Sequence, residues 1–321
     1  MPSSLTHYWF AKDVVHKNKE ALPFLKEKQY KYVTYVGTQG PDVLFFYGMV
    51  PMRKRKDAKF VQQYGTKLHQ QGISDKFLKM FDYVSSAKID NKNHLYAYIF
   101  GAMLHYCLDR IVHPYVYYKT GFDTGVKGEH NLVDHTLFES MIDTEVLGHF
   151  NTNPYETRSC KVINAPKEFI HDVSVMYAYR EEIDSETFYS AWQDMLTAEK
   201  MLLDRLHFKR ALLRIIGMRY TTPYTLIHRH HKSKKDTIDY LNVSKQEWHN
   251  PANNQIYHDS FWDLYELAFK DSETIVKIMQ DFINGKDIKN DVIKFCQDQN
   301  YNGLFLGETH KYYKSVYKEG D

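Results

Sequence analysis

The chain has 321 residues, of which 43% are hydrophobic and 15% aromatic, so it can bury a sizeable core and does not have the composition of a disordered protein. Its 42 Lys and Arg residues nearly balance 40 Asp and Glu residues, which leaves no strong basic field for binding nucleic acid or anionic lipid. The 17 histidines, about 5% of the residues, suggest metal binding or acid–base chemistry.

The first part of the chain places apolar residues at helical spacing. This pattern predicts helices, in chain order, over residues 5–15, 20–35, 56–71, 75–86 and 94–112. Pro23 falls in the first turn of the second helix, where proline is tolerated, and Pro114 should end or kink the fifth. The Gly and Pro residues within 37–48 indicate a loop.

The remainder of the chain is also helical in pattern. After a loop over 121–128, we expect helices over residues 132–150, 166–182, 185–219, 260–284 and 304–317. Residues 221–259 have no clear periodicity, and their basic stretch 228–235 is more often a solvated surface than a phosphate site. The sequence predicts an all-α multi-helix bundle with a metal cluster between helices. A helical core over 1–160 should pack with a helical half over 161–321 as one domain.

Cysteine usage and the N-terminal segment indicate a cytoplasmic protein. The three cysteines, Cys107, Cys160 and Cys296, are far apart, which argues against a disulfide framework and leaves no Cys-x-x-Cys metal site. The start of the chain has no basic region followed by an apolar one, as a secretory signal would have. The uncharged run 95–108 is shorter than the roughly 20 apolar residues of a membrane span, so we expect a buried helix and no transmembrane segment.

One predicted helix carries three polar side chains within an apolar segment. His105, Asp109 and His113 follow one another at intervals of four residues, so they lie on one face of the helix. An isolated buried carboxylate is very costly, and a divalent metal would compensate Asp109. Imidazole and carboxylate are ligands that Zn²⁺ accepts. A hydrogen-bonded core network of His and Asp is the alternative.

The next helix repeats this spacing with His135, Glu139 and Asp143. If the two helices run antiparallel, their polar stripes face each other and form a two-metal pocket. His130 competes with His135 as a ligand, and we favour His135 because Glu139 is in register with it. Asp143 could orient His135 through its other ring nitrogen.

The order of motifs resembles the bacterial zinc-dependent phospholipase C family, which is similar to the single-strand-specific zinc nucleases. The residues that carry the resemblance are Thr6-His7, Gly40-Pro41-Asp42, His69, Leu104-His105-Tyr106, Asp109, His113, and His135 with Glu139. That family is all-helical and holds three zinc ions between its helices. Taken alone, His7 would be a packed histidine and Asp42 a turn residue.

The resemblance implies a set of metal ligands. Asp42, His69, His105 and Asp109 would hold one zinc; His113, His135 and Glu139 a second; and His7 with Asp109 would contribute to a third. In the family the third zinc is also bound by an N-terminal Trp, whereas this chain starts with Met1. His113 follows Asp109 by four residues instead of six, and the interval from Asp42 to His69 is longer than in the secreted enzymes.

The function that follows is zinc-dependent phosphoester hydrolysis. Two or three Zn²⁺ ions would polarise the phosphoryl oxygen and provide a zinc-bound hydroxide that attacks a phosphodiester, with Asp42 as ligand or base. The substrate would be a small-molecule or lipid phosphoester, as expected of a phospholipase C-like enzyme. A phosphodiesterase or nuclease on the same scaffold is one alternative, although the near-neutral charge makes nucleic acid an unlikely partner. A non-catalytic helical module stabilised by zinc is another. His249 is expected to lie outside the cluster.

Overall fold

A computed structural model describes residues 4–122, 131–153, 155–203, 208–215 and 238–317 of the chain. Its α-helices are α1 (Ser4–Asn18), α2 (Lys28–Gly37), α3 (Ala58–Gln70), α4 (Ile73–Ser86), α5 (Asn93–Thr120), α6 (Asn131–His149), α7 (Ser159–Val162), α8 (Lys167–Ala178), α9 (Ser185–Leu202), α10 (Phe208–Ile215), α11 (Phe261–Ile283) and α12 (Lys289–Cys296). Three short 3-10 helices are η1 (Pro23–Lys26), η2 (Gly40–Phe46) and η3 (Pro51–Arg53). A small antiparallel hairpin pairs β1 (Trp248–His249) with β2 (Ile256–Tyr257). The predicted all-α fold is confirmed.

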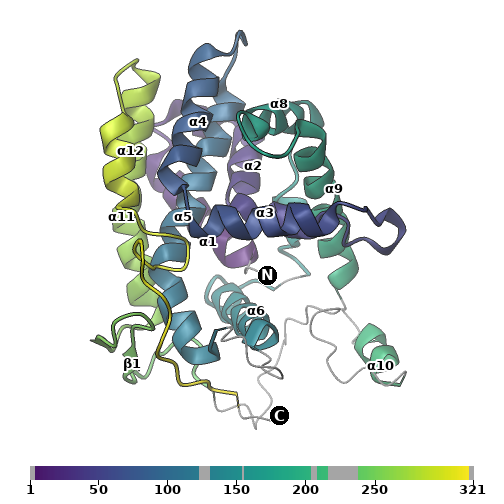
Figure 1. Cartoon of the computed structure of the whole chain (residues 1–321), viewed down its shortest axis with the longest axis vertical. Coiled ribbons are helices and arrows are strands. Elements are labelled where there is room, and N and C mark those ends of the chain that lie inside the picture. The colour runs from purple at the N-terminus through teal and green to yellow at the C-terminus, as the bar shows by residue number, and fades with distance from the viewer. Residues whose placement is uncertain (1–3, 123–130, 154, 204–207, 216–237, 318–321) are drawn as a thin grey trace.

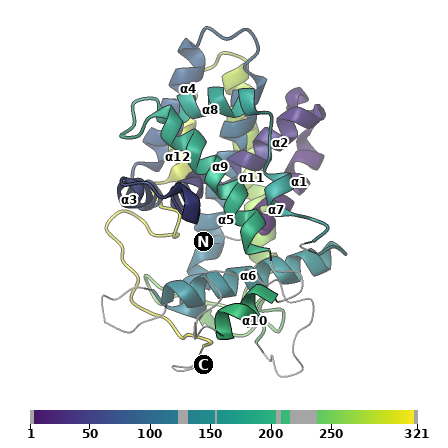
Figure 2. The ribbon, with the colours of Figure 1, turned by 90° about the vertical axis from the view of Figure 1, so that its right-hand side faces the viewer.

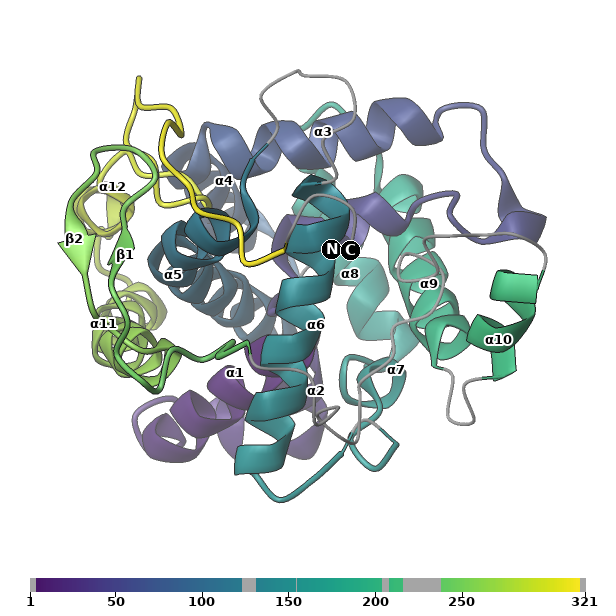
Figure 3. The same cartoon turned by 90° about the horizontal axis from the view of Figure 1, so that it is seen from below.

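The central element is α5, which is buried on nearly all sides. A helix that is apolar around its whole circumference must be enclosed by other elements. Helices α2, α8 and α11 pack along α5, and α9 packs on α8 and on η2. Figures 1 and 3 show α11 and α12 on one side of α5, with α8 and α9 on the other. None of the described helices combines the length and apolar character needed to cross a membrane.

The helix α6 lies across the lower end of α5 (Figures 1 and 2). The two helices cross, so the antiparallel arrangement considered for them from the sequence is not the one observed. The two elements meet where the rings of Tyr115 and Phe138 are 5.8 Å apart. The crossing still brings part of each polar stripe together, which is the feature that matters for the site.

Three predicted element boundaries differ from the structure. The single helix expected over 20–35 is interrupted, because Glu27 has extended backbone (φ −81°, ψ 130°) and separates η1 from α2. Pro114 does not end α5, which continues to Thr120. The loop expected over 37–48 contains the 3-10 helix η2, which carries Asp42.

The C-terminal segment is not the helix predicted over 304–317. Gly303 and Gly307 have left-handed backbone (φ 77° and 88°), which interrupts a helix. Residues Lys314 and Val316 donate their backbone N–H groups to the last turn of α5, at distances of 2.8 Å from the carbonyl oxygens of Tyr118 and Lys119. Residues 297–317 therefore form an irregular segment tied to α5, which we name the C-terminal strap.

Two further predicted regions are only partly described. In place of one helix over 185–219, the structure has α9 and the separate α10. Of the unassigned stretch 221–259, residues from 238 onward are described and contain the β1–β2 hairpin. The basic stretch 228–235 lies outside the described residues.

Candidate metal centre

Three groups of candidate metal ligands meet around the face of α5 that carries His105, Asp109 and His113. They are Asp42 with His69 and His105; His7 with His105 and Asp109; and His113 with His135 and Glu139. Within each group one possible ligand atom per residue lies within 4.8 Å of the others. All eight residues singled out in the sequence therefore belong to these groups. Their role as ligands remains a prediction.

The first group joins η2, the end of α3 and the middle of α5. His69 Nε2 lies 2.8 Å from Asp42 Oδ1, and His105 Nε2 lies 3.6 Å from Asp42 Oδ2. The turn before Asp42 requires glycine, because Gly40 has φ 49° and a Cβ there would lie 2.3 Å from His105 Cδ2. The Gly-Pro-Asp sequence thus brings the backbone against the His105 ring and presents Asp42 to it.

The second group brings α1 against α5. His7 Nε2 lies 3.0 Å from Asp109 Oδ1, while Asp109 Oδ2 lies 3.1 Å from His105 Nε2. The rings of His7 and His105 are 4.3 Å apart. Asp109 thus lies between two histidines that come from different helices.

Asp143 determines where α1 begins. Its Oδ1 accepts hydrogen bonds from the Thr6 backbone N–H (2.7 Å) and hydroxyl (2.6 Å), and its Oδ2 accepts one from the Leu5 N–H (3.2 Å). The role predicted for Asp143, orienting His135, is wrong, because His135 Nδ1 has no hydrogen-bond partner. The carboxylate instead satisfies the first N–H groups of α1 and fixes the turn that carries His7.

The third group joins α5 to α6. Glu139 Oε1 lies 3.1 Å from His135 Nε2 and 3.3 Å from His113 Nε2. His135 therefore occupies the predicted place beside Glu139. The competing His130 lies outside the described residues.

Three of the histidines use Nδ1 to bond a backbone carbonyl. His69 donates to Gly65 O at 2.8 Å, His105 to Thr38 O at 2.9 Å, and His113 to Tyr301 O at 2.7 Å. A carbonyl only accepts, so each Nδ1 carries a proton, and in the neutral form of each ring the lone pair lies on Nε2. These Nε2 atoms are the ones that face the carboxylates, which is how metal-binding imidazoles are oriented in proteins.

The C-terminal strap covers this cluster, a feature that could not be predicted from the residue pattern. The Tyr301 N–H donates to His69 O at 3.1 Å, while Tyr301 O accepts from His113. The Tyr301 ring packs 4.9 Å from the His69 ring and 5.5 Å from the His105 ring. One strap residue therefore links histidines of the first and third groups. Its backbone groups carry no residue-type signal, so no motif could have revealed it.

Several buried atoms of the cluster lack a hydrogen-bond partner. They are Asp42 Oδ2, His105 Nε2, Asp109 Oδ2 and Glu139 Oε2. Unsatisfied buried carboxylate oxygens are rare and costly in native proteins. Nitrogen and oxygen donors of this kind bind Zn²⁺ at 2.0–2.2 Å, so two tetrahedral ligands lie roughly 3.3 Å from each other. The observed separations of 2.8–3.6 Å match that spacing. The residues present therefore fit zinc.

Electrostatic coupling in the cluster is strong. Burial opposes ionisation of Asp109, but the neighbouring histidines, His105 first, outweigh it and hold the pKa of Asp109 well below its usual range. Glu139 behaves in the same way, with His135 and His113 lowering its pKa against the effect of burial. For His113, burial lowers the pKa, yet Asp109 and Glu139 raise it further, to about 9. The carboxylates are thus charged at neutral pH and available to a cation.

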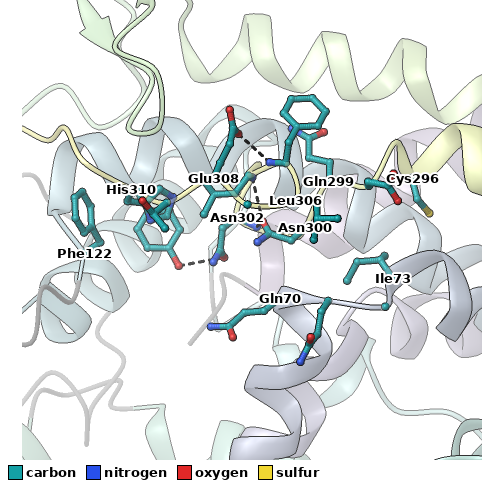
Figure 4. A pocket seen from close by; sticks show the side chains of 18 of the residues that line it. Gln70, Ile73, Phe122, Cys296, Gln299, Asn300, Asn302, Leu306, Glu308 and His310 are labelled. Atoms are coloured by element: carbon teal, nitrogen blue, oxygen red, sulfur yellow. Dashed lines mark hydrogen bonds between the residues drawn. The ribbon is translucent and has the colours of Figure 1, made fainter.

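A cavity of about 980 Å³ lies beneath the C-terminal strap (Figure 4). Its walls come from the strap, from the turn between α3 and α4, and from Tyr117 and Phe122. None of the eight candidate ligands lines it. Tyr117 contacts both the cavity and the third group, since its ring lines the cavity and lies 4.8 Å from the His135 ring. His249 belongs to neither: its half-buried ring lies on the β1–β2 hairpin, with Nε2 2.8 Å from Glu247 Oε1 and the ring stacked on Tyr118.

Comparison with protein families matches residues 6–194 to a family model described as zinc dependent phospholipase C. The match covers more than half of the chain and includes all eight candidate ligands, whereas the C-terminal strap lies beyond it. Comparison with curated proteins and with solved structures gave no match.

Proposed function

Because the chain belongs to the zinc-dependent phospholipase C family, we propose that it hydrolyses a phosphodiester, with a phospholipid as substrate. The family consists of zinc-dependent hydrolases. The observation that supports the proposal most directly is the convergence of eight metal-binding side chains from α1, η2, α3, α5 and α6, with buried oxygen and nitrogen atoms left unpartnered. Packing of helices alone does not explain buried polar atoms without hydrogen-bond partners.

The geometry supports a particular sharing of ligands. His105 Nε2 lies near both Asp42 and Asp109, and one imidazole nitrogen binds one ion. The ion held by His105 and His69 would therefore also be bound by Asp42 and Asp109. Asp109 Oδ1 lies beside His7 Nε2, so His7 and Asp109 would help to hold a second ion.

The third group would hold a further ion through its two imidazoles and one carboxylate. Among the described residues His113, His135 and Glu139 would hold it, and three protein ligands is the number that catalytic zinc sites use. Bound zinc supplies Lewis acidity, which polarises a phosphoryl oxygen and lowers the pKa of a water molecule toward about 7.

The side chains around the ions have separate proposed roles. Asp42 would take a proton from the attacking water at Oδ2, which has no hydrogen-bond partner, while Oδ1 stays beside His69. Glu139 and Asp109 hold the negative charge that keeps the ions in place. The rings of Tyr301 and Tyr117 pack on the histidines and limit the access of bulk water.

The test is hydrolysis of a short-chain phosphatidyl lipid by zinc-loaded protein. We expect release of diacylglycerol and a phosphorylated headgroup, loss of activity with a chelator, and its return with added Zn²⁺. Bis-nitrophenyl phosphate and single-stranded DNA serve as parallel substrates. Preferential cleavage of the DNA would favour the nuclease alternative, and inactivity of fully loaded protein on every substrate would favour a structural role for zinc.

A further inference from the structure

His310, on the C-terminal strap, lines the cavity beneath the strap without a role in the metal cluster. Its ring packs 4.3 Å from Tyr117 and 5.1 Å from Phe122 (Figure 4). Tyr117 in turn packs 4.8 Å from His135. The ring centres of His310 and His135 are therefore at most about 9 Å apart. Tyr117 lies between these two rings, so a small group attached to a phosphate at the third group would span this distance by passing beside the Tyr117 ring.

The hydrogen bonding of His310 leaves one ring nitrogen unused. The backbone of Asn302 forms a hydrogen bond with the ring, and Nε2 is buried without a partner. This backbone partner raises the pKa of His310, as an accepting carbonyl does, and Nε2 has no partner, so the bond is assigned to Nδ1–H and the neutral ring keeps its lone pair on Nε2. This is the arrangement seen at His69, His105 and His113. Burial also lowers the pKa of His310 to about 4, so the ring is neutral near pH 7.

The frame around His310 is fixed by hydrogen bonds. The Tyr117 hydroxyl donates to Asn302 Oδ1 at 3.2 Å, and the Asn302 N–H donates to Asn300 Oδ1 at 2.9 Å (Figure 4). Asn302 thus holds both Tyr117 and His310 in place. A ring positioned in this way can discriminate between ligands, since it is not free to turn its other nitrogen toward them.

We propose that this cavity binds the headgroup of the phosphoester, and that His310 Nε2 accepts a hydrogen bond from an O–H or N–H group of that headgroup. The inference rests on the proposed function and names the headgroup class. A bare imidazole nitrogen only accepts, so a quaternary ammonium, which has no hydrogen to donate, leaves it unsatisfied. A site built for a hydrogen bond rejects an analogue that lacks the donor.

The experiment compares dihexanoyl phosphatidylethanolamine, phosphatidylglycerol and phosphatidylcholine with zinc-loaded protein. The ethanolamine and choline lipids have the same charge, but the choline headgroup carries three methyl groups in place of the N–H donors, so the His310 variants are needed to separate loss of the hydrogen bond from the added bulk. We expect kcat/KM for the ethanolamine and glycerol lipids to exceed that for the choline lipid by about tenfold. In His310→Ala the advantage should shrink to within twofold, and His310→Gln, which retains an acceptor oxygen, should restore most of it.

His249→Ala, a half-buried histidine on the hairpin, is the matched control and should keep the preference. Zinc content and melting temperature are measured for each variant, so that a loosened strap is recognised. Equal kcat/KM for the three lipids in the wild type, or a preference that survives in His310→Ala, overturns the inference while leaving the proposed hydrolysis intact.

Binding provides a second readout that needs no turnover. Calorimetric titration with phosphoethanolamine and phosphocholine should show about tenfold tighter binding of the former to the wild type and equal binding to His310→Ala. If this difference is found in a protein that hydrolyses no lipid, the role of His310 stands and the proposed reaction fails. Equal binding of both compounds to the wild type contradicts the role of His310.

Discussion

Asp143 on α6 accepts two hydrogen bonds from Thr6 on α1, one from its backbone N–H and one from its hydroxyl. Thr6 directly precedes His7, whose Nε2 faces Asp109. A carboxylate far along the chain therefore fixes the helix turn that brings a candidate ligand to the cluster. Asp143 therefore supports the position of His7 even though it belongs to none of the three groups of candidate ligands.

Replacing Asp143 should weaken α1 and the group that contains His7. We expect Asp143→Ala to lower the free energy of unfolding by about 2 kcal/mol, as loss of a helix cap does, and to reduce metal content at the His7 group. Asp143→Asn keeps one acceptor oxygen, so its stability and metal content should lie between those of the wild type and of Asp143→Ala. Urea unfolding and metal analysis measure both effects. Selective loss of the ion near His135 would instead indicate that Asp143 orients His135, as its spacing on α6 suggested.

Gly40→Ala should disturb the metal site because its new Cβ would collide with the His105 ring. Gly72→Ala is the matched control, since Gly72 also has positive φ (69°) but has open space around its Cβ position. Both variants should lose roughly 1–2 kcal/mol of stability from backbone strain. Only Gly40→Ala should lose metal and hydrolysis. Equal metal loss in the two variants would show that strain, not contact with His105, is responsible.

Metal-free protein should become less stable between pH 6.5 and 9. The folded-state pKa of His113 is raised to about 9, so its contribution is fully present below the unfolded-state value of 6.5 and is lost as pH rises through 9. The loss should be roughly 3 kcal/mol at most. Zinc-loaded protein should not weaken over this range, because metal binding competes with protons on imidazole. The test is to measure the free energy of unfolding in urea for the metal-free and the zinc-loaded protein across this pH range. The same dependence on pH in both forms would contradict the prediction.

Asp109→Asn keeps the size of the side chain but removes the charge that would bridge two ions. It should release at least one zinc and abolish hydrolysis while the helical circular dichroism persists. His249→Ala should keep the full metal content. Retention of every ion by Asp109→Asn, or loss of one by His249→Ala, would mean that the cluster is a hydrogen-bonded core and not a metal centre.

The helical face of α5 could be predicted from local spacing, because His105, Asp109 and His113 share one regular helix. Asp42 and His7 could be predicted only through the family resemblance, since a single polar residue in a turn or a short helix carries no such pattern. The close packing of Gly40 against His105 explains in physical terms why the Gly-Pro-Asp motif accompanies the helix.

The contributions of Tyr301 and His310 could not be predicted from the sequence. Both lie in the irregular strap, and their positions depend on backbone hydrogen bonds to residues nearly 200 positions earlier, such as that of Tyr301 to His113. Asp143 was misassigned for a related reason. Its spacing from Glu139 places it on the correct helix face, but spacing within α6 says nothing about where α1 begins.

The most direct test of the account is the metal content of the whole chain, purified without chelator and measured by mass spectrometry of the native protein together with elemental analysis. The three groups of buried His, Asp and Glu side chains predict two to three zinc ions per chain. A well-folded sample, supplied with zinc, that contains less than one equivalent of any transition metal would contradict it.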